Sequence, residues 1–109
     1  MSVNLEPSSG DWQFIVASAG TSDPSGVSTV NISVQFEWAC IDEGHSFGGE
    51  QSTGEIDPFT AANGWGFGSD AICELPGSTP VVVSVTVWAT AVDTLGNGTT
   101  SSHRVFSKP

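Results

Sequence analysis

The sequence predicts an all-β domain in which two antiparallel sheets enclose one apolar core. Two long segments, residues 30–40 and 81–92, alternate apolar and polar side chains with a period of two. Such alternation is typical of strands that bury one face and expose the other to water. The chain also has 13 glycines and many serines and threonines, a mixture that disfavours long helices and suits turns and strands.

Length and composition indicate one domain. The chain has 109 residues, of which 38% are hydrophobic. That length is enough for one buried core and too short for two domains. We therefore expect residues 1–109 to fold as a single unit.

The segment from Val30 to Cys40 has the clearest strand pattern. A helix would scatter its apolar residues around the circumference, whereas a strand aligns them on one face. We expect this face to meet the core through six side chains: Val30, Ile32, Val34, Phe36, Trp38 and Cys40.

The second long segment begins after Pro80, whose missing N–H is tolerated best at a strand start. Trp88 falls outside its apolar row, so we expect this ring to be half-exposed or packed under a loop. A final strand from about Thr99 to Ser107 is expected to pair with the segment across a turn containing Asn97-Gly98. The row expected to face the core comprises Val81, Val83, Val85, Val87, Ala89 and Ala91.

Shorter patterns predict three further strands. Val3 and Leu5 begin a short edge strand that Pro7 limits. Another short strand is expected at residues 71–75. A strand over residues 12–17 places three apolar side chains on one side: Trp12, Phe14 and Val16.

Residues 42–70 contain seven glycines and no long alternating run, which predicts a long Gly-rich loop region. One helical turn is expected inside it, with Asp57 as the N-cap, Pro58 at its first position and Gly64 as its stop. Trp65 and Phe67 then follow between glycines. These two rings are expected either to present flat faces to a sugar or a protein partner, or to fold back over an open edge of the sandwich.

The C-terminal third combines an alternating strand that ends at Asp93, a turn containing Gly96 and Asn97, and a closing strand. This arrangement resembles the last hairpin of bacterial and phage immunoglobulin-like domains. Residues 30–38 resemble an early core strand of the same sandwiches. The resemblance covers about half of the chain and implies an immunoglobulin-like antiparallel β-sandwich of about seven strands. An antibody-type domain is not expected, because Trp38 precedes both cysteines and the chain has no Tyr.

By this resemblance the chain is expected to be a non-enzymatic structural or interaction protein. The sequence begins at Met1 without a signal-peptide pattern, which suits a virion protein that leaves the cell by lysis. We therefore expect a phage head decoration or tail protein that docks on capsid or tail subunits and that is able to form a homo-oligomer. The alternative is a carbohydrate- or surface-binding module, outside the cell or on its surface by a non-classical route, with Trp65, Phe67 and Trp88 as binding residues.

The charge balance excludes some partners. Twelve acidic residues face two basic ones, for a formal net charge of −10. The chain cannot neutralise nucleic-acid phosphates, and an anionic membrane surface would repel it. No apolar run is long enough for a membrane span, so we expect no membrane insertion. The acidity indicates solubility, or attraction to a basic partner or to divalent cations.

Calcium is the one cofactor that the sequence suggests. Asp42 and Glu43 follow one strand end, and Asp93 and Asn97 flank another, so their oxygens are candidate ligands. The pair Asp93 and Asn97 is equally explained by turn chemistry.

Catalytic patterns are incomplete. His45 lies near Asp42 and Glu43, which supports a third hypothesis of a small hydrolase, and Glu55 with Asp57 is another carboxylate pair. Neither pattern supplies a nucleophile, a base and an orienting group, so we expect no enzyme. Cys40 and Cys73 are expected either to form one disulfide or to remain as two buried thiols.

Overall fold

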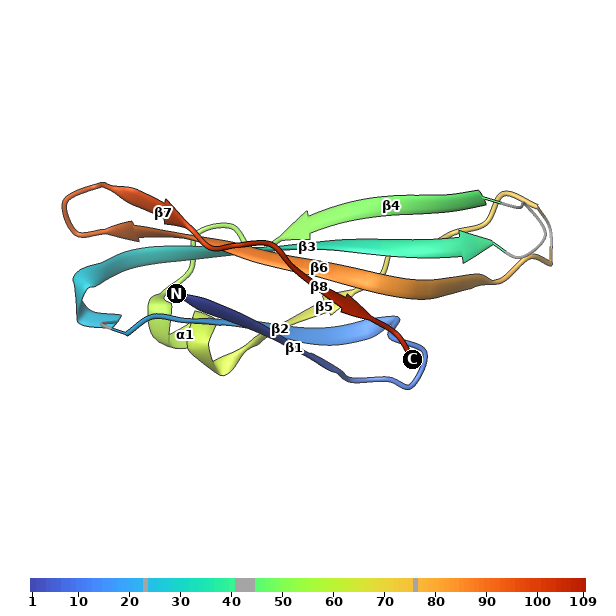
Figure 1. Ribbon diagram of the computed structural model, residues 1–109, viewed down its shortest axis with the longest axis horizontal. Helices are drawn as coiled ribbons and strands as arrows, with labels where there is room; N and C mark the ends of the chain where they lie inside the picture. The colour runs from blue at the N-terminus through green and yellow to red at the C-terminus, as the bar shows by residue number, and fades with distance from the viewer. Residues whose placement is uncertain (23, 41–44, 76) are drawn as a thin grey trace.

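The computed structural model describes residues 1–22, 24–40, 45–75 and 77–109, which form two antiparallel sheets packed face to face (Figure 1). One sheet has the order β1-β2-β5, and the other has the order β4-β3-β6, with β7 and β8 both paired to β6. The body measures 50 × 22 × 18 Å, so it is elongated along its strands. The predicted all-β, two-sheet architecture is confirmed. The elements are β1 (Ser2–Pro7), β2 (Phe14–Gly20), a 3₁₀ turn (Pro24–Gly26), β3 (Val27–Cys40), β4 (His45–Ser52), α1 (Pro58–Asn63), β5 (Trp65–Gly68), β6 (Pro80–Asp93), β7 (Gly98–Thr100) and β8 (Arg104–Ser107).

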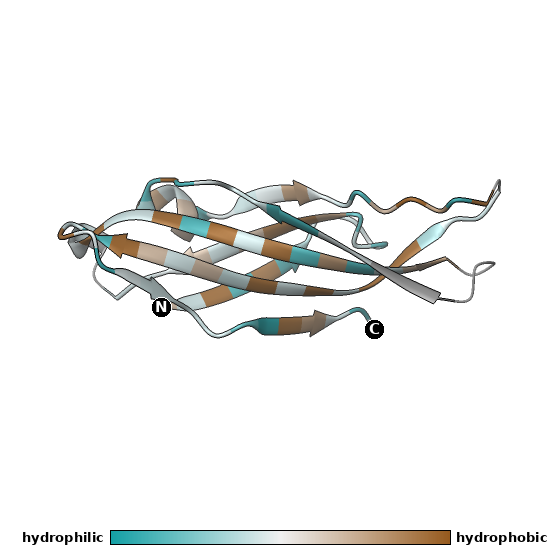
Figure 2. Cartoon of the chain, turned by 90° about the horizontal axis from the view of Figure 1, so that it is seen from above, coloured by the Kyte–Doolittle hydropathy of each residue, from teal (hydrophilic) through white to brown (hydrophobic). Residues whose placement is uncertain are grey.

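The two longest strands, β3 and β6, form the centre of the core. They pair antiparallel from Val27 opposite Asp93 to Cys40 opposite Pro80. Apolar and polar residues alternate along both strands in Figure 2. The core face predicted for β3 is confirmed, because all six of its side chains are buried: Val30, Ile32, Val34, Phe36, Trp38 and Cys40.

The core row predicted for β6 is wrong at its beginning. Val83 is exposed, whereas Val82 is fully buried. The ladder to β3 shifts register between Glu37 and Trp38, where Val83 has no opposite residue. A bulge of this kind adds one residue to one strand and inverts the alternation beyond it. After the bulge the predicted row is correct, with four buried residues: Val85, Val87, Ala89 and Ala91.

Strand β2 also differs from its prediction. It begins at Phe14, not at Trp12, and Phe14 faces solvent. The opposite face is the one that packs on the core, through Ile15, Ala17 and Ala19. Its neighbour β1 lies at the edge of this sheet, as predicted, and buries Val3 and Leu5.

A side-chain network explains the late start of β2. The Gln13 N–H donates to Asp11 Oδ1 at 3.1 Å, and the Phe14 N–H donates to Ser9 Oγ at 3.2 Å. Trp12, which stands between Asp11 and Gln13, adopts a left-handed conformation with a φ of 61°. Local bonds of this kind compete with strand pairing, so the alternation at residues 12–14 does not produce an extended strand there.

The middle of the chain is not a long loop. It contains β4, which pairs with β3, and β5, which pairs with β2. Between them lies α1, where the predicted caps are confirmed: Asp57 Oδ2 accepts the Thr60 N–H at 3.0 Å, and Gly64 has a φ of 109°. A Cβ on Gly64 would lie 2.6 Å from Val16 Cγ1, so a larger residue does not fit there. The prediction failed because a Gly-rich strand shows no alternation, although its backbone pairs normally.

The strand predicted at residues 71–75 does not form, since this segment joins no ladder. A disulfide connects Cys73 to Cys40, with 5.9 Å between their Cα atoms. The Trp38 Nε1–H also donates to the Ile72 carbonyl at 3.4 Å. The segment is therefore fastened to the end of β3 through a covalent bond and side-chain contacts instead of a ladder.

The closing strand is divided. Between β7 and β8, the Ser101 N–H donates to the Ala89 carbonyl at 2.8 Å, and Ser101 Oγ accepts the Ala89 N–H at 2.9 Å. A side-chain oxygen thus takes the place of a backbone carbonyl opposite Ala89. The ladder resumes at Arg104, which pairs with Val87.

The adjacent glycines of β4 are expected to respond differently to substitution. A Cβ on Gly49 would lie 3.1 Å from the Trp38 ring, whereas a Cβ on Gly48 would lie 3.4 Å from the end of the Gln35 side chain and 3.8 Å from the Phe36 carbonyl oxygen. Gly49→Val should therefore lower the free energy of unfolding by about 1–3 kcal/mol through overpacking. Urea denaturation measures the difference, with Gly48→Ala as the control. Equal stability of both variants and the wild type would contradict the close packing of Trp38 on Gly49.

The disulfide should contribute strongly to stability. The bridged residues are 33 apart in sequence. Closing a loop of that size in the unfolded chain is worth about 3–4 kcal/mol in the chain-entropy description. We expect Cys40→Ala/Cys73→Ala to lower the free energy of unfolding by roughly that amount, as measured by urea denaturation. Alkylation of both thiols in the native, unreduced protein would show that the bridge does not form.

Candidate functional site

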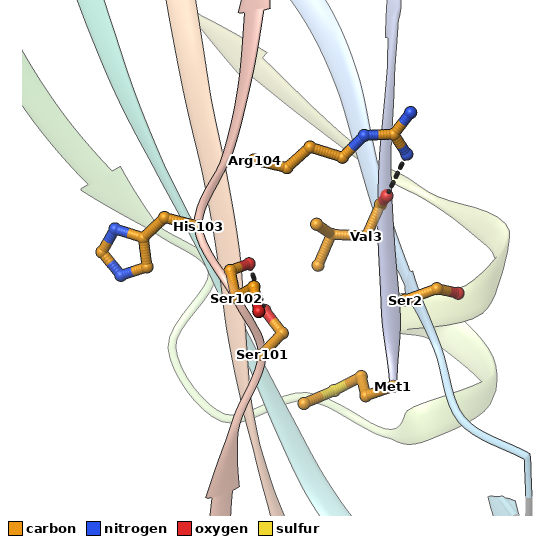
Figure 3. A pocket seen from close by; sticks show the side chains of 7 residues that line it. All are labelled: Met1, Ser2, Val3, Ser101, Ser102, His103 and Arg104. Atoms are coloured by element: carbon orange, nitrogen blue, oxygen red, sulfur yellow. Dashed lines mark hydrogen bonds between the residues drawn. The ribbon is translucent and has the colours of Figure 1, made fainter.

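A groove lies on one open side of the sandwich, between β1 and the connection from β7 to β8 (Figure 3). It has a volume of about 250 Å³ and is lined by Met1, Ser2, Val3, Ser101, Ser102, His103 and Arg104. Arg104 crosses the groove, and its Nη1 donates to the Val3 carbonyl at 3.1 Å. The guanidinium also lies 4.8 Å from the centre of the Phe106 ring. Since Arg104 joins the two sheets at this side, its role here is structural.

Trp88 lies on the outer face of its sheet, where its side chain is half-buried. The sequence predicts a ring that is half-exposed or packed under a loop, and the ring is both half-exposed and covered by His103 from the connection between β7 and β8. His103 stacks on the indole, with ring centres 4.4 Å apart and an angle of 15° between planes. The His103 side chain is turned away from the groove in Figure 3. One face of Trp88 is therefore occupied within the protein and is not free for a ligand.

The two aromatic residues of β5 do not form an exposed pair. Phe67 is only 5% exposed and belongs to the core, while Trp65 is 37% exposed. Their partners across the ladder to β2 are Ile15 and Ala17, both buried. Phe67 thus follows the expectation that the ring folds back into the sandwich. The hypothesis of a binding site that uses both rings is wrong, because the core encloses one of them.

The predicted calcium ligands are only partly described. Asp93 and Asn97 form the turn after β6: Asp93 Oδ1 accepts the N–H groups of Leu95 at 2.9 Å and Asn97 at 2.8 Å. Asp42 and Glu43 lie outside the described residues. Cys40, which precedes them, pairs with Pro80, at the far end of β6 from Asp93. The described part supports the turn interpretation of Asp93 and Asn97, and calcium binding stays a prediction.

The described residues form no arrangement of side chains that supports the catalytic hypothesis. Asp57 is engaged as the helix cap and accepts hydrogen bonds from Thr60 N and Oγ1. Among the described residues, no three His, Cys, Asp or Glu side chains gather closely enough to hold a metal ion. His45 begins β4, with its backbone opposite Cys40.

Among the described residues, no helix is long and apolar enough to cross a membrane.

The sheet edges differ in how well they are protected. The edge strand β1 ends in Glu6 and Pro7, a charge and a residue without a backbone donor. The edge strand β5 has four residues, and its Gly68 carbonyl accepts a hydrogen bond from Gln51 Nε2 at 2.6 Å. The edge formed by β7 and β8 is interrupted between Thr100 and Arg104. Prolines, charges, short strands and interruptions are the usual means of preventing unwanted strand addition.

The fourth edge, β4, has little such protection. Within the described ranges this strand lies at the end of its sheet and pairs with β3 alone, and it extends over eight residues without a proline. Its sequence HSFGGEQS has one acidic residue, Glu50, and two adjacent glycines. Sequence reasoning missed this strand because it lacks alternation. Its length and openness make it the candidate interface.

Acid should weaken the turn after β6. Hydrogen bonds from the Asn97 N–H and then the Leu95 N–H lower the pKa of Asp93 below its ordinary value of 3.8. A depressed pKa stabilises the fold above the unfolded-state pKa of about 3.9, and this stabilisation disappears as the pH falls through the folded-state pKa. We expect the Asp93 carboxyl to titrate below 3.8 by NMR. Asp93→Asn should also lose more stability at pH 7 than at acidic pH, and a midpoint above the ordinary value would contradict the turn bonds.

Comparisons with known proteins find no match for the chain. No protein-family model matches it, and no curated protein or solved structure matches it significantly. The two-sheet architecture is therefore observed directly in this chain. The immunoglobulin-like detail still depends on the pattern of its sequence.

Proposed function

We propose that this chain is a non-enzymatic structural protein that docks on other subunits of a virion, as a phage head decoration or tail component. The observation that carries the docking role is the open edge of β4, which is eight residues long and, in the part of the chain that the structure describes, is paired on one side only. An exposed edge of this length offers a row of backbone donors and acceptors to a neighbouring chain. The virion setting is supported by the resemblance of the closing hairpin around Asp93 and Asn97 to phage immunoglobulin-like domains.

The body of the domain suits a mechanical role. Strands β3 and β6 have 14 residues each and extend through most of the 50 Å long axis. A core of tightly packed side chains such as Phe36, Ile15 and Val85 joins the two sheets. Because such interiors have low compressibility, the sandwich can transmit force between neighbours without changing shape.

The outer surface also provides apolar anchors for docking. Phe14 and Phe59 are about three-fifths exposed, at 61% and 62%, and Leu95 is 86% exposed. Large apolar side chains that remain in water gain free energy when a partner covers them. They lie on separate elements, β2, α1 and the turn after β6, so several neighbours have anchoring points.

The proposal predicts that the chain travels with particles. After particles from the native source are separated on a density gradient, mass spectrometry should find the chain in the particle band at a constant ratio to the major capsid or tail subunit. A salt wash should distinguish docking from loose adsorption, because screened surface charges release an adsorbed acidic protein. Recovery of the chain only in the soluble fraction would overturn the proposal.

A further inference from the structure

The backbone of β4 has a defined set of groups that point away from its sheet. The Thr53 N–H donates to the Ile32 carbonyl at 2.9 Å, which sets the hydrogen-bonding phase of the pair β3–β4. In an antiparallel ladder, successive residues direct their backbone groups alternately toward the neighbour and away from it. Gly48, Glu50 and Ser52 therefore direct their N–H and C=O groups outward, to a side where none of the described strands is paired.

The position of the glycines makes this edge accessible. Gly48 and Gly49 place no large side chain beside the outward backbone groups, and a single methyl group at Gly48 would leave them accessible. Gly49 is held in place by the Trp38 ring, which packs beneath it. The edge is thus open on its outer side and supported on its inner side.

Charge around the edge selects the partner. Glu37 and Glu50 are exposed on the outer face of the sheet, on β3 and β4. On the other side of β4, Gln51 Nε2 donates to the exposed carboxylate of Asp70 at 3.2 Å. The chain has only two cationic side chains. Both lie in or directly after β8, which is separated from β4 by β3 and β6.

We propose that β4 receives an extended, basic segment of a partner protein as an added strand. Backbone hydrogen bonds to Gly48, Glu50 and Ser52 hold the segment, and its Lys or Arg side chains on the outer face lie beside Glu50. Glu37 is one strand further away, and its carboxylate accepts a hydrogen bond from Ser84 Oγ at 3.2 Å. A second copy of the chain is disfavoured at this edge, because it brings a further net charge of −10. The inference rests on the proposed docking function and names the chemistry of the docked segment.

A synthetic peptide tests the edge directly. The probe is an eight-residue peptide of alternating Lys and Val with blocked ends, and the matched control replaces each Lys with Glu. Titration into the full-length, disulfide-bonded protein should shift and protect the amides of Gly48, Glu50 and Ser52 in NMR and hydrogen-exchange measurements. The Glu peptide should bind at least about tenfold more weakly. Absence of binding by the Lys peptide, or shifts located at β1, β5 or β8, would overturn the proposal.

Two pairs of variants separate the backbone from the charge. Gly48→Pro removes an outward N–H on an edge strand, where proline is tolerated, and should weaken the Lys peptide at least about tenfold. Gly48→Ala keeps the N–H and should bind within about twofold of wild type. Glu50→Lys should reverse the peptide preference, while Glu50→Gln should only weaken it. Circular dichroism checks that each variant folds. If Gly48→Pro fails to fold, the two Glu50 variants still test the edge independently.

The outcomes also separate this inference from the proposed function. If Gly48→Pro still incorporates into particles at the wild-type ratio, the chain docks by another surface and the inference is wrong, although the structural role stands. If the peptide binds as described and the chain never enters particles, the edge is correct and the virion role is wrong. A wild-type dimer in solution that Gly48→Pro converts to monomer would show that a second copy occupies β4, which overturns the basic partner.

Discussion

The pairing of β3 with β6 is the contact on which the rest of the structure depends. The ladder extends from Val27 to Cys40 on one strand and from Asp93 to Pro80 on the other. It presents one continuous apolar face, and each other element of this sheet pairs with one of the two strands: β4 with β3, and β7 and β8 with β6. The second sheet packs on that face through β1 and β2, whose inward residues are Val3, Leu5, Ile15, Ala17 and Ala19.

At one end of this pair, a chain of contacts joins three segments that are distant in sequence. The Trp38 ring packs against Gly49 of β4, and its indole N–H reaches the carbonyl of Ile72. The next residue, Cys73, is bonded to Cys40 two positions beyond Trp38. The space left by Gly49, the buried Trp38 ring and the Cys40–Cys73 disulfide therefore depend on one another. This arrangement holds β4 at the margin of the sheet with its outer edge open.

Charge is distributed unevenly across the same sheet. Arg104 and Lys108 are in or directly after β8 at one margin, and Arg104 is used to join the sheets through Val3. Exposed Glu37 and Glu50 lie toward the opposite margin. The two margins of this sheet therefore differ in the sign of their charged side chains. Because acidic side chains lie near the open edge of β4 and the basic ones lie near β8, we expect the partner of β4 to be basic.

The sequence by itself determined the all-β class, the core face of β3, the caps of α1 and the turn at Asp93, because each depends on local periodicity or local hydrogen bonds. Tertiary structure decided where the β6 alternation inverts, since a bulge at Val83 is defined only by its partner strand. It also decided that Phe67 is buried, that Cys73 bonds to Cys40 and that the Gly-rich residues 45–52 form an edge strand. In each of these cases the outcome depends on a neighbour far away in the chain, and no local pattern contains that information.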